Sequence, residues 1–175
     1  MTDRHEERSS FVVSDLPHYA ILAPVPLEHL QSALDGGSDW KYVAFGTRKW
    51  ELFRQVDAMR DGSRVAMLIY PSHEDENAKT SLVVSWFGWY VGCIDGIGGA
   101  HPEGMTFRPP STALNPSDNK GHWAAFWHVA GLRELPKEKQ MPIGKIEGFK
   151  GGWRKTAPPR GPELVTLPEK LSYEK

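Results

Sequence analysis

Two cations and a carboxylate lie close together in the segment AFGTRKWE, as Arg48, Lys49 and Glu51. This group could clamp a phosphate electrostatically, or Lys49 and Glu51 could transfer protons as a base and an acid. The alternative is structural, with Arg48 capping a turn and Glu51 on the first turn of a helix, where negative charge suits the dipole. Because an opposite charge stabilises the ammonium form of a lysine, Glu51 disfavours proton transfer by Lys49.

Aromatic side chains are concentrated in two strand candidates, residues 81–94 and 123–132. They are Trp86, Trp89, Tyr90, Trp123, Phe126 and Trp127. Alternate residues of a strand share a face, so Trp86 and Trp89 must point to opposite sides of a sheet. We expect half of the set in the core, while the other half could form a cage that stacks a base, at about 1 to 3 kcal/mol per base.

Other motifs are weaker. Arg108 precedes two prolines in a loop and could reach a phosphate. The glycine-rich segment 96–99 opens no helix, so a phosphate-binding loop is not expected. The histidines have no metal-ligand spacing, and no GxSxG motif is present, so we predict neither a metal site nor a serine hydrolase triad.

The periodicity predicts the elements that position these residues. Leu52, Val56 and Met59 recur at helical spacing, and Gly62 is the expected stop of that helix. The apolar run 65–70 follows as a strand buried on both faces. Upstream, a strand at 18–23, a helix with Leu27, Leu30 and Leu34 on one face, and a strand at 40–45 are expected. No βαβ alternation is apparent, and the fold class is α+β, a small mixed barrel with a few short flanking helices.

Composition limits the functional classes. The chain has 175 residues and a net charge of -1, so attraction to a polyanion would have to be local. We expect a polar tail at 1–16, one domain at 17–156 and a proline-rich extended tail at 157–175. One cysteine excludes an intrachain disulfide. No apolar run reaches the roughly 18 residues of a membrane span, and the charged N-terminus is unlike a signal peptide, so a cytoplasmic protein without membrane contact is expected. No cofactor is expected.

The order of several short motifs resembles the EVE branch of the PUA-like superfamily. The motifs are HYAILAPVPLEHLQ, the turn at 44–49, Met59 to Ser63, Tyr70 to Ser72 and Tyr90 to Gly92. The resemblance covers 19–149 and departs from the family at Lys49, Ser63 and Pro71, where the family has Asn, Asp and His. The segment 95–121 is an insert without a counterpart. The motif Gly46-x-Arg48-x-x-Glu51 is similar to the ASCH signature, with Phe53 in place of its last arginine.

The resemblance implies a small PUA-like barrel that binds nucleic acid and is not an enzyme. It would hold a plain or modified base of DNA or RNA, or a nucleotide-like small molecule, in an aromatic pocket beside the barrel. The implied ligand-binding residues are Phe45, Arg48, Lys49, Tyr70, Ser72, Trp86, Trp89, Arg108, Trp127 and His128. Two alternatives stay open. One is an ASCH-like hydrolase of an acylated nucleoside or RNA that uses Lys49 and Glu51, and the other is a Trp-rich domain that binds protein.

Overall fold

The computed structural model describes residues 17–35, 41–72, 82–152, 161–172 and 174. Two α-helices in this part are α1 (Leu27–Leu34) and α2 (Trp50–Arg60). The strands are β1 (Tyr19–Pro26), β2 (Val43–Thr47), β3 (Val65–Ser72), β4 (Val83–Val84), β5 (Trp86–Asp95), β6 (Ala125–Glu134), β7 (Met141–Pro142) and β8 (Glu163–Thr166). Short 3-10 helices include η1 (Pro110–Leu114) and η2 (Pro116–Asn119).

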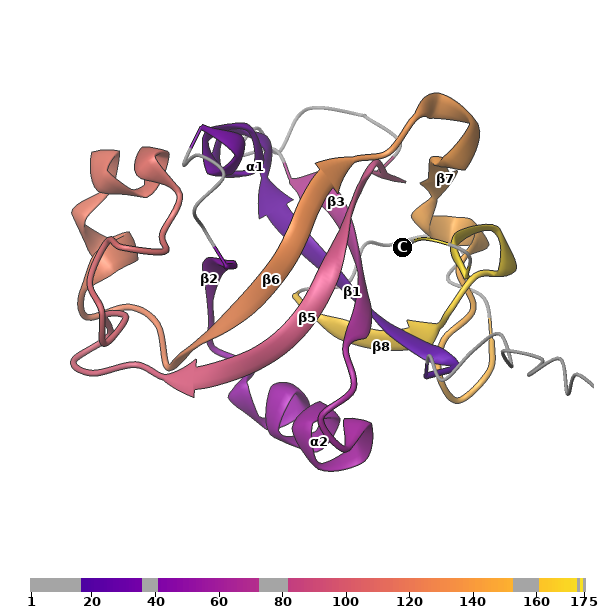
Figure 1. The fold of residues 1–175 in the computed structure, drawn as a ribbon, viewed down its shortest axis with the longest axis horizontal. Helices are drawn as coiled ribbons and strands as arrows, with labels where there is room; N and C mark the ends of the chain where they lie inside the picture. Colours follow the sequence, from indigo (N-terminus) through magenta and orange to yellow (C-terminus); the bar gives the residue numbers. More distant parts are fainter. Residues whose placement is uncertain (1–16, 36–40, 73–81, 153–160, 173, 175) are drawn as a thin grey trace, which may run out of the picture.

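Six of these strands form one sheet that curls into a half-barrel (Figure 1). Its order is β2-β6-β5-β3-β1-β8, with β1 and β3 parallel and the other neighbours antiparallel. Strands β4 and β7 pair separately. The strand-rich α+β class predicted from the sequence is therefore confirmed, together with its short helices.

The sequence predicted no βαβ alternation, and this prediction is wrong for the first half of the chain. Its elements run β1, α1, β2, α2, β3, and β1 lies parallel to β3. The alternation is irregular because β2 has only five residues and pairs with β6 at the edge of the sheet, away from β1. A short edge strand of this kind gives little periodic signal in a sequence.

Both faces of the sheet are covered by core. Alternate residues of β1 belong to two separate apolar clusters, with Ile21 in one cluster and Leu22 in the other. Strand β5 divides in the same way, because Trp86 packs in the first cluster and Trp89 in the second. Burial on both faces explains the continuous apolar run of β3 and confirms the prediction of a doubly buried strand.

Helix α2 packs on the sheet with a face that matches the predicted one in part, since Leu52 is half-buried against the first core cluster. Val56 is fully buried as expected, but Met59 is 39% exposed. Phe53 takes the central position instead, with its ring 5.4 Å from that of Tyr90 and 5.8 Å from that of Trp127. The large aromatic side chain buries more apolar area than Met59 would, which favours this rotation. The helix ends as predicted, since Asp61 and Gly62 both have positive φ. In α1, the predicted apolar-face residue Leu34 is also exposed.

The insert 95–121 is a compact unit that lies beside α1 and β2 (Figure 1). The Gly121 N–H donates to the Gly98 carbonyl at 2.7 Å and closes its base. The Ala44 N–H donates to the Phe107 carbonyl at 2.8 Å and fastens the insert to β2. The longest irregular stretch of the sequence is therefore an ordered wall beside the sheet.

The expected C-terminal tail contributes a strand. β8 pairs antiparallel with β1 at the edge of the sheet. Beyond it, the carboxylate of Glu174 forms ion pairs with Arg133 and Lys139. The tail at 1–16 and the boundary between 156 and 157 lie outside the described residues. No α-helix in the described ranges is long and apolar enough to cross a membrane.

Candidate functional site

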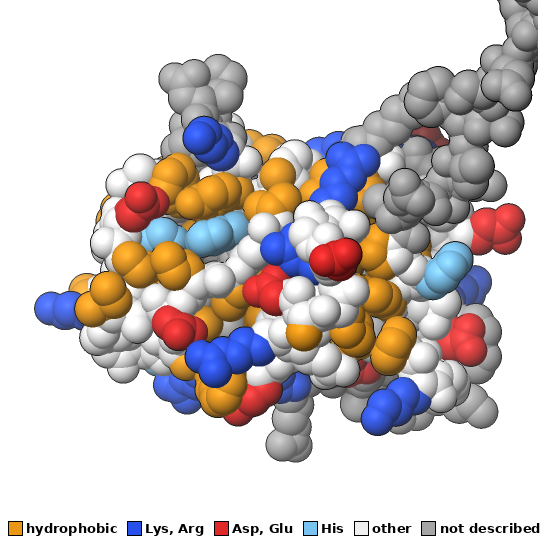
Figure 2. All heavy atoms as spheres, turned by 60° about the horizontal axis from the view of Figure 1, so that its bottom comes forward, with side chains coloured by type: hydrophobic (Ala, Val, Ile, Leu, Met, Phe, Trp, Pro, Cys, Tyr) orange, Lys and Arg blue, Asp and Glu red, His pale blue; other side chains and the backbone are white. Residues whose placement is uncertain are grey.

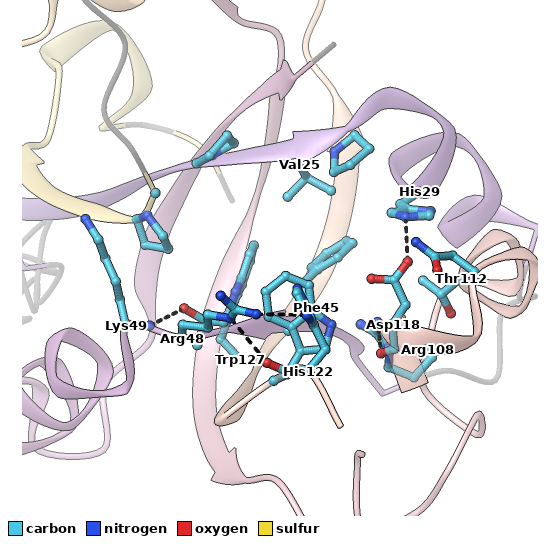
Figure 3. A pocket seen from close by; sticks show the side chains of 18 residues that line it. Val25, His29, Phe45, Arg48, Lys49, Arg108, Thr112, Asp118, His122 and Trp127 are labelled. Carbon is cyan, nitrogen blue, oxygen red and sulfur yellow. Dashed lines mark hydrogen bonds and ion pairs between the residues drawn. The ribbon is translucent and has the colours of Figure 1, made fainter. Parts of the chain in front are cut away.

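A pocket of about 440 Å³ opens where the end of β1, the turn between β2 and α2, and the insert meet (Figure 3). Arg48 and Lys49 lie on one side of it, and His29, Thr112 and Asp118 lie on the other. The remaining lining residues are Pro24, Val25, Pro26, Phe45, Gly46, Thr47, Arg108, Asn115, His122, Trp123, Trp127, Gly161 and Pro162. The pocket therefore joins apolar, cationic and acidic side chains from segments far apart in the sequence.

The cationic side is formed by the turn after β2. Arg48 Nη2 donates to His122 Nδ1 at 3.0 Å, and Arg48 Nε donates to the His122 carbonyl at 3.4 Å. The Lys49 N–H donates to the Thr47 hydroxyl at 3.0 Å. The aliphatic part of the Lys49 side chain lies close to Gly161. A Cβ added at Gly161 would be 3.3 Å from the Cε of Lys49. Both side chains are exposed, so their charges face solvent and the pocket mouth.

The apolar wall is aromatic. Phe45 and Trp127 are directly opposite on β2 and β6, with ring centroids 4.8 Å apart. Trp123 packs over Gly46, where a Cβ would lie 2.4 Å from the indole ring, so only glycine fits. The buried indole N–H groups of Trp123 and Trp127 have no hydrogen-bond partner among the described residues. Unpaired buried donors are costly, at about 1 to 3 kcal/mol each, so this part of the wall is strained.

The insert contributes the opposite wall. His29 Nε2 of α1 lies 3.5 Å from Asp118 Oδ2 of η2, and both side chains are largely buried. Arg108 is only 3% exposed and donates to three groups, the Ala44 carbonyl at 2.7 Å, Asn119 Oδ1 at 3.2 Å and the Asp118 carbonyl at 3.1 Å. Burial lowers the pKa of Arg108 to about 10, partly offset by Asp118. Arg108 is therefore still charged at neutral pH, and it fixes Asp118 and the insert against β2.

Five of the ten implied ligand-binding residues meet at this pocket. They are Phe45, Arg48, Lys49, Arg108 and Trp127. The guanidinium of Arg108 is already engaged by protein groups, so its position in the wall is structural.

The other five implied residues do not line the pocket. Tyr70, Trp86 and Trp89 are buried in the two core clusters. Ser72 ends β3 beside Pro26 and is half-buried. His128 follows Trp127 on β6 and therefore points to the opposite face of the strand.

Sequence reasoning missed four pocket residues, His29, Asp118, His122 and Trp123, as parts of one site. His29 and Asp118 are 89 residues apart in the sequence, so no local pattern of residues indicates that they meet. A signal was present only for Trp123, which belongs to the aromatic set on the second strand candidate. Glu51, the proposed acid of the hydrolase alternative, is exposed and does not line the pocket.

A histidine pair lies on the other face of β6. His101 Nε2 and His128 Nε2 are 3.0 Å apart, and His128 stacks on Tyr42 with centroids 4.0 Å apart. The Glu103 N–H donates to His101 Nδ1, so His101 carries its proton on Nε2 and donates it to His128. Burial, with His101 as a second cause, lowers the pKa of His128 to about 4. Burial also lowers the pKa of His101, where Glu103 opposes the shift and Arg108 adds to it.

This pair predicts a stability loss in mild acid. The pKa of His128 is about 4 in the folded chain and near its ordinary value of 6.5 after unfolding, so below pH 6.5 the unfolded state binds the extra proton. Urea unfolding should show a free energy that falls by on the order of 3 kcal/mol from pH 6.5 to pH 4. His128→Gln removes the titration and should flatten this dependence. Equal slopes for the two proteins would contradict the argument.

Comparisons with known proteins do not assign the site. No protein-family model matches the chain, and no curated protein or solved structure is significantly similar to it. Within the described ranges, no three His, Cys, Asp or Glu side chains are grouped to hold a metal ion. The chemistry of the pocket therefore has to be inferred from its own side chains.

Proposed function

We propose that the pocket binds a nucleobase together with its phosphate, as part of a plain or modified DNA or RNA strand or as a nucleotide-like molecule. The observation that carries this proposal is the combination, in one pocket, of an aromatic wall with two exposed cations at its mouth. The half-barrel sheet and the position of the pocket beside it are compatible with the PUA-like resemblance of the sequence.

The size and lining suit a base. Pockets for small ligands have volumes of about 300 to 1,000 Å³ and apolar or aromatic walls with a few polar groups. Here the volume is about 440 Å³, and Phe45, Trp123 and Trp127 form the aromatic part. The acidic side at Asp118 can accept hydrogen bonds from the N–H groups of a base edge. A base would thus contact the half-buried ring of Trp123, since Phe45 and Trp127 are at most 4% exposed, and the insert would orient it.

The charge distribution suits a phosphate at the mouth. Arg48 uses Nε and Nη2 on His122, and its guanidinium keeps further N–H donors for an anion. Lys49 adds a second charge beside it. On the face in Figure 2, positive and negative side chains are interspersed, in agreement with the net charge of -1. Attraction to nucleic acid would therefore come from this pair of cations and would weaken with salt.

The two alternatives have less structural support. A hydrolase that uses Lys49 with Glu51 requires both groups at the substrate, but Glu51 does not line the pocket. A Trp-rich docking surface requires exposed indoles. Trp86, Trp89 and Trp127 are each at most 4% exposed, and Trp50, at 36%, is the single exposed tryptophan of the described ranges. The geometry therefore favours base binding over both.

Arg48→Ala tests the proposal. We expect the affinity for single-stranded oligonucleotides to fall at least about tenfold, because a charge-assisted contact to phosphate is lost. Fluorescence anisotropy with labelled DNA and RNA that carry plain, methylated, hydroxymethylated or acetylated cytosine measures the affinity, at low and high salt. Free nucleotides are titrated in parallel to separate strand binding from nucleotide binding.

Arg64→Ala is the matched control, because Arg64 is an exposed arginine that does not line the pocket. Its affinity should equal that of the wild type within a factor of two or so. Absence of binding to every oligonucleotide and nucleotide, or equal losses in the two variants, would refute a base-binding pocket.

A further inference from the structure

We infer that Ser111 is an activated nucleophile served by His29 and Asp118, a catalytic activity beyond the proposed binding function. Ser111 Oγ lies 2.6 Å from His29 Nδ1, and His29 Nε2 lies 3.5 Å from Asp118 Oδ2. The three residues come from η1, α1 and η2, which the insert brings together. A hydroxyl, an imidazole and a carboxylate in this order are the groups that activate serine in hydrolases of unrelated folds, here with the two ring nitrogens exchanged, since Nδ1 faces the serine.

The surrounding hydrogen bonds direct the serine proton toward the imidazole. The Ser111 N–H donates to Ser32 Oγ at 3.0 Å, and the Ser32 hydroxyl donates to Ser111 Oγ at 2.9 Å. The Ser111 hydroxyl is then left to donate, with His29 Nδ1 nearer at 2.6 Å than the Glu28 carbonyl at 3.3 Å. In the tautomer that carries its proton on Nε2, His29 accepts this hydrogen bond at Nδ1, and its N–H faces the carboxylate of Asp118.

Burial strengthens this chain of contacts. The side chains of His29 and Asp118 are 13% and 15% exposed, and their charges interact more strongly there than in water. Arg108 holds the Asp118 backbone through its carbonyl, so the carboxylate is kept in place. His29 and Asp118 line the pocket wall, and Ser111 is half-buried beside them.

The chemistry that follows is acyl transfer from a small carboxylic ester. Ser111 Oγ forms a bond to the carbonyl carbon while its proton passes to His29 Nδ1, and Asp118 stabilises the resulting imidazolium. The bond from that carbon to the alcohol oxygen breaks, and the alcohol leaves with the proton from His29. Water then attacks the acylated serine by the same proton transfers, which returns the free serine and a carboxylic acid.

A fluorophosphonate probe tests this inference on the full chain. Ser111 Oγ would displace fluoride and form a phosphonylated serine, which peptide mass spectrometry locates. We expect modification at Ser111 and not at Ser117, an exposed serine of the same insert whose hydroxyl donates to Asn115 Oδ1. Hydrolysis of p-nitrophenyl acetate should show the same dependence on Ser111.

Two variants separate activation from exposure. His29→Asn keeps a polar atom near the Nδ1 position without the base, and Asp118→Asn keeps the shape of the carboxylate. Each should slow labelling of Ser111 at least about tenfold, with circular dichroism spectra like that of the wild type. Equal labelling of Ser111 and Ser117, no labelling of Ser111, or unchanged rates in both variants would overturn the inference. Oligonucleotide binding is measured separately, so its outcome does not decide this one.

Discussion

Replacement of Arg108 by alanine should lower the free energy of unfolding by about 3 to 5 kcal/mol and abolish binding at the pocket. The guanidinium is buried, donates to Ala44, Asp118 and Asn119, and lies 5.1 Å from the centre of the Phe126 ring. Hydrogen bonds from a charged donor contribute about 1.5 to 3 kcal/mol each, and their loss leaves buried acceptors unpaired. Urea unfolding at neutral pH measures the effect on stability, and anisotropy measures binding.

Arg64→Ala is again the matched control. The Arg64 guanidinium packs over Trp89 at 3.9 Å, but its side chain is exposed, so its loss should cost less than about 1 kcal/mol. Arg108→Lys keeps the charge without the planar fork and should lie between the alanine variant and the wild type. If Arg108→Ala unfolded at the same urea concentration as the wild type, the insert could not depend on this arginine.

Arg108 also shows where sequence reasoning stops. In the sequence it is a cation before two prolines, which reads as a loop side chain near solvent. Its partners Ala44 and Asp118 are 64 and 10 residues away, and nothing local indicates that a carbonyl of β2 will face it. The contacts His29–Asp118 and His29–Ser111 arise in the same way, from the docking of the insert on α1. Local patterns do not encode such pairs.

The helices and strands were predictable because burial of one or both faces imposes a regular pattern of apolar residues on the sequence. Apolar residues at helical spacing and doubly buried runs located α1, α2 and β3, with glycine at the expected stop. Strand alternation correctly separated Trp86 from Trp89. It could not tell which side holds the pocket, because apolar core covers both faces of the sheet. Trp127 faces the pocket and His128 faces away for the same reason of alternation.

Replacement of Trp127 by alanine should lower the free energy of unfolding as much as replacement of Arg108 does. Trp127 is 1% exposed, and the centre of its ring lies 4.8 Å from that of Phe45 and 5.8 Å from that of Phe53. Trp127→Ala should cost about 3 to 5 kcal/mol, since it removes this packing and leaves a cavity beneath the pocket. The base-binding wall would collapse or soften, so oligonucleotide affinity should fall with stability. Chemical unfolding and anisotropy measure the two effects.

Trp50→Ala is the control that separates burial from residue type. Trp50 is 36% exposed, and the Arg54 guanidinium covers its ring at 4.4 Å from the centroid, so the same substitution should cost about 1 kcal/mol or less. Trp127→Phe keeps an aromatic ring in contact with Phe45 and Phe53 and should recover much of the stability. Equal destabilisation of the Trp50 and Trp127 variants would show that the β2–β6 aromatic wall is not the support of this end of the sheet.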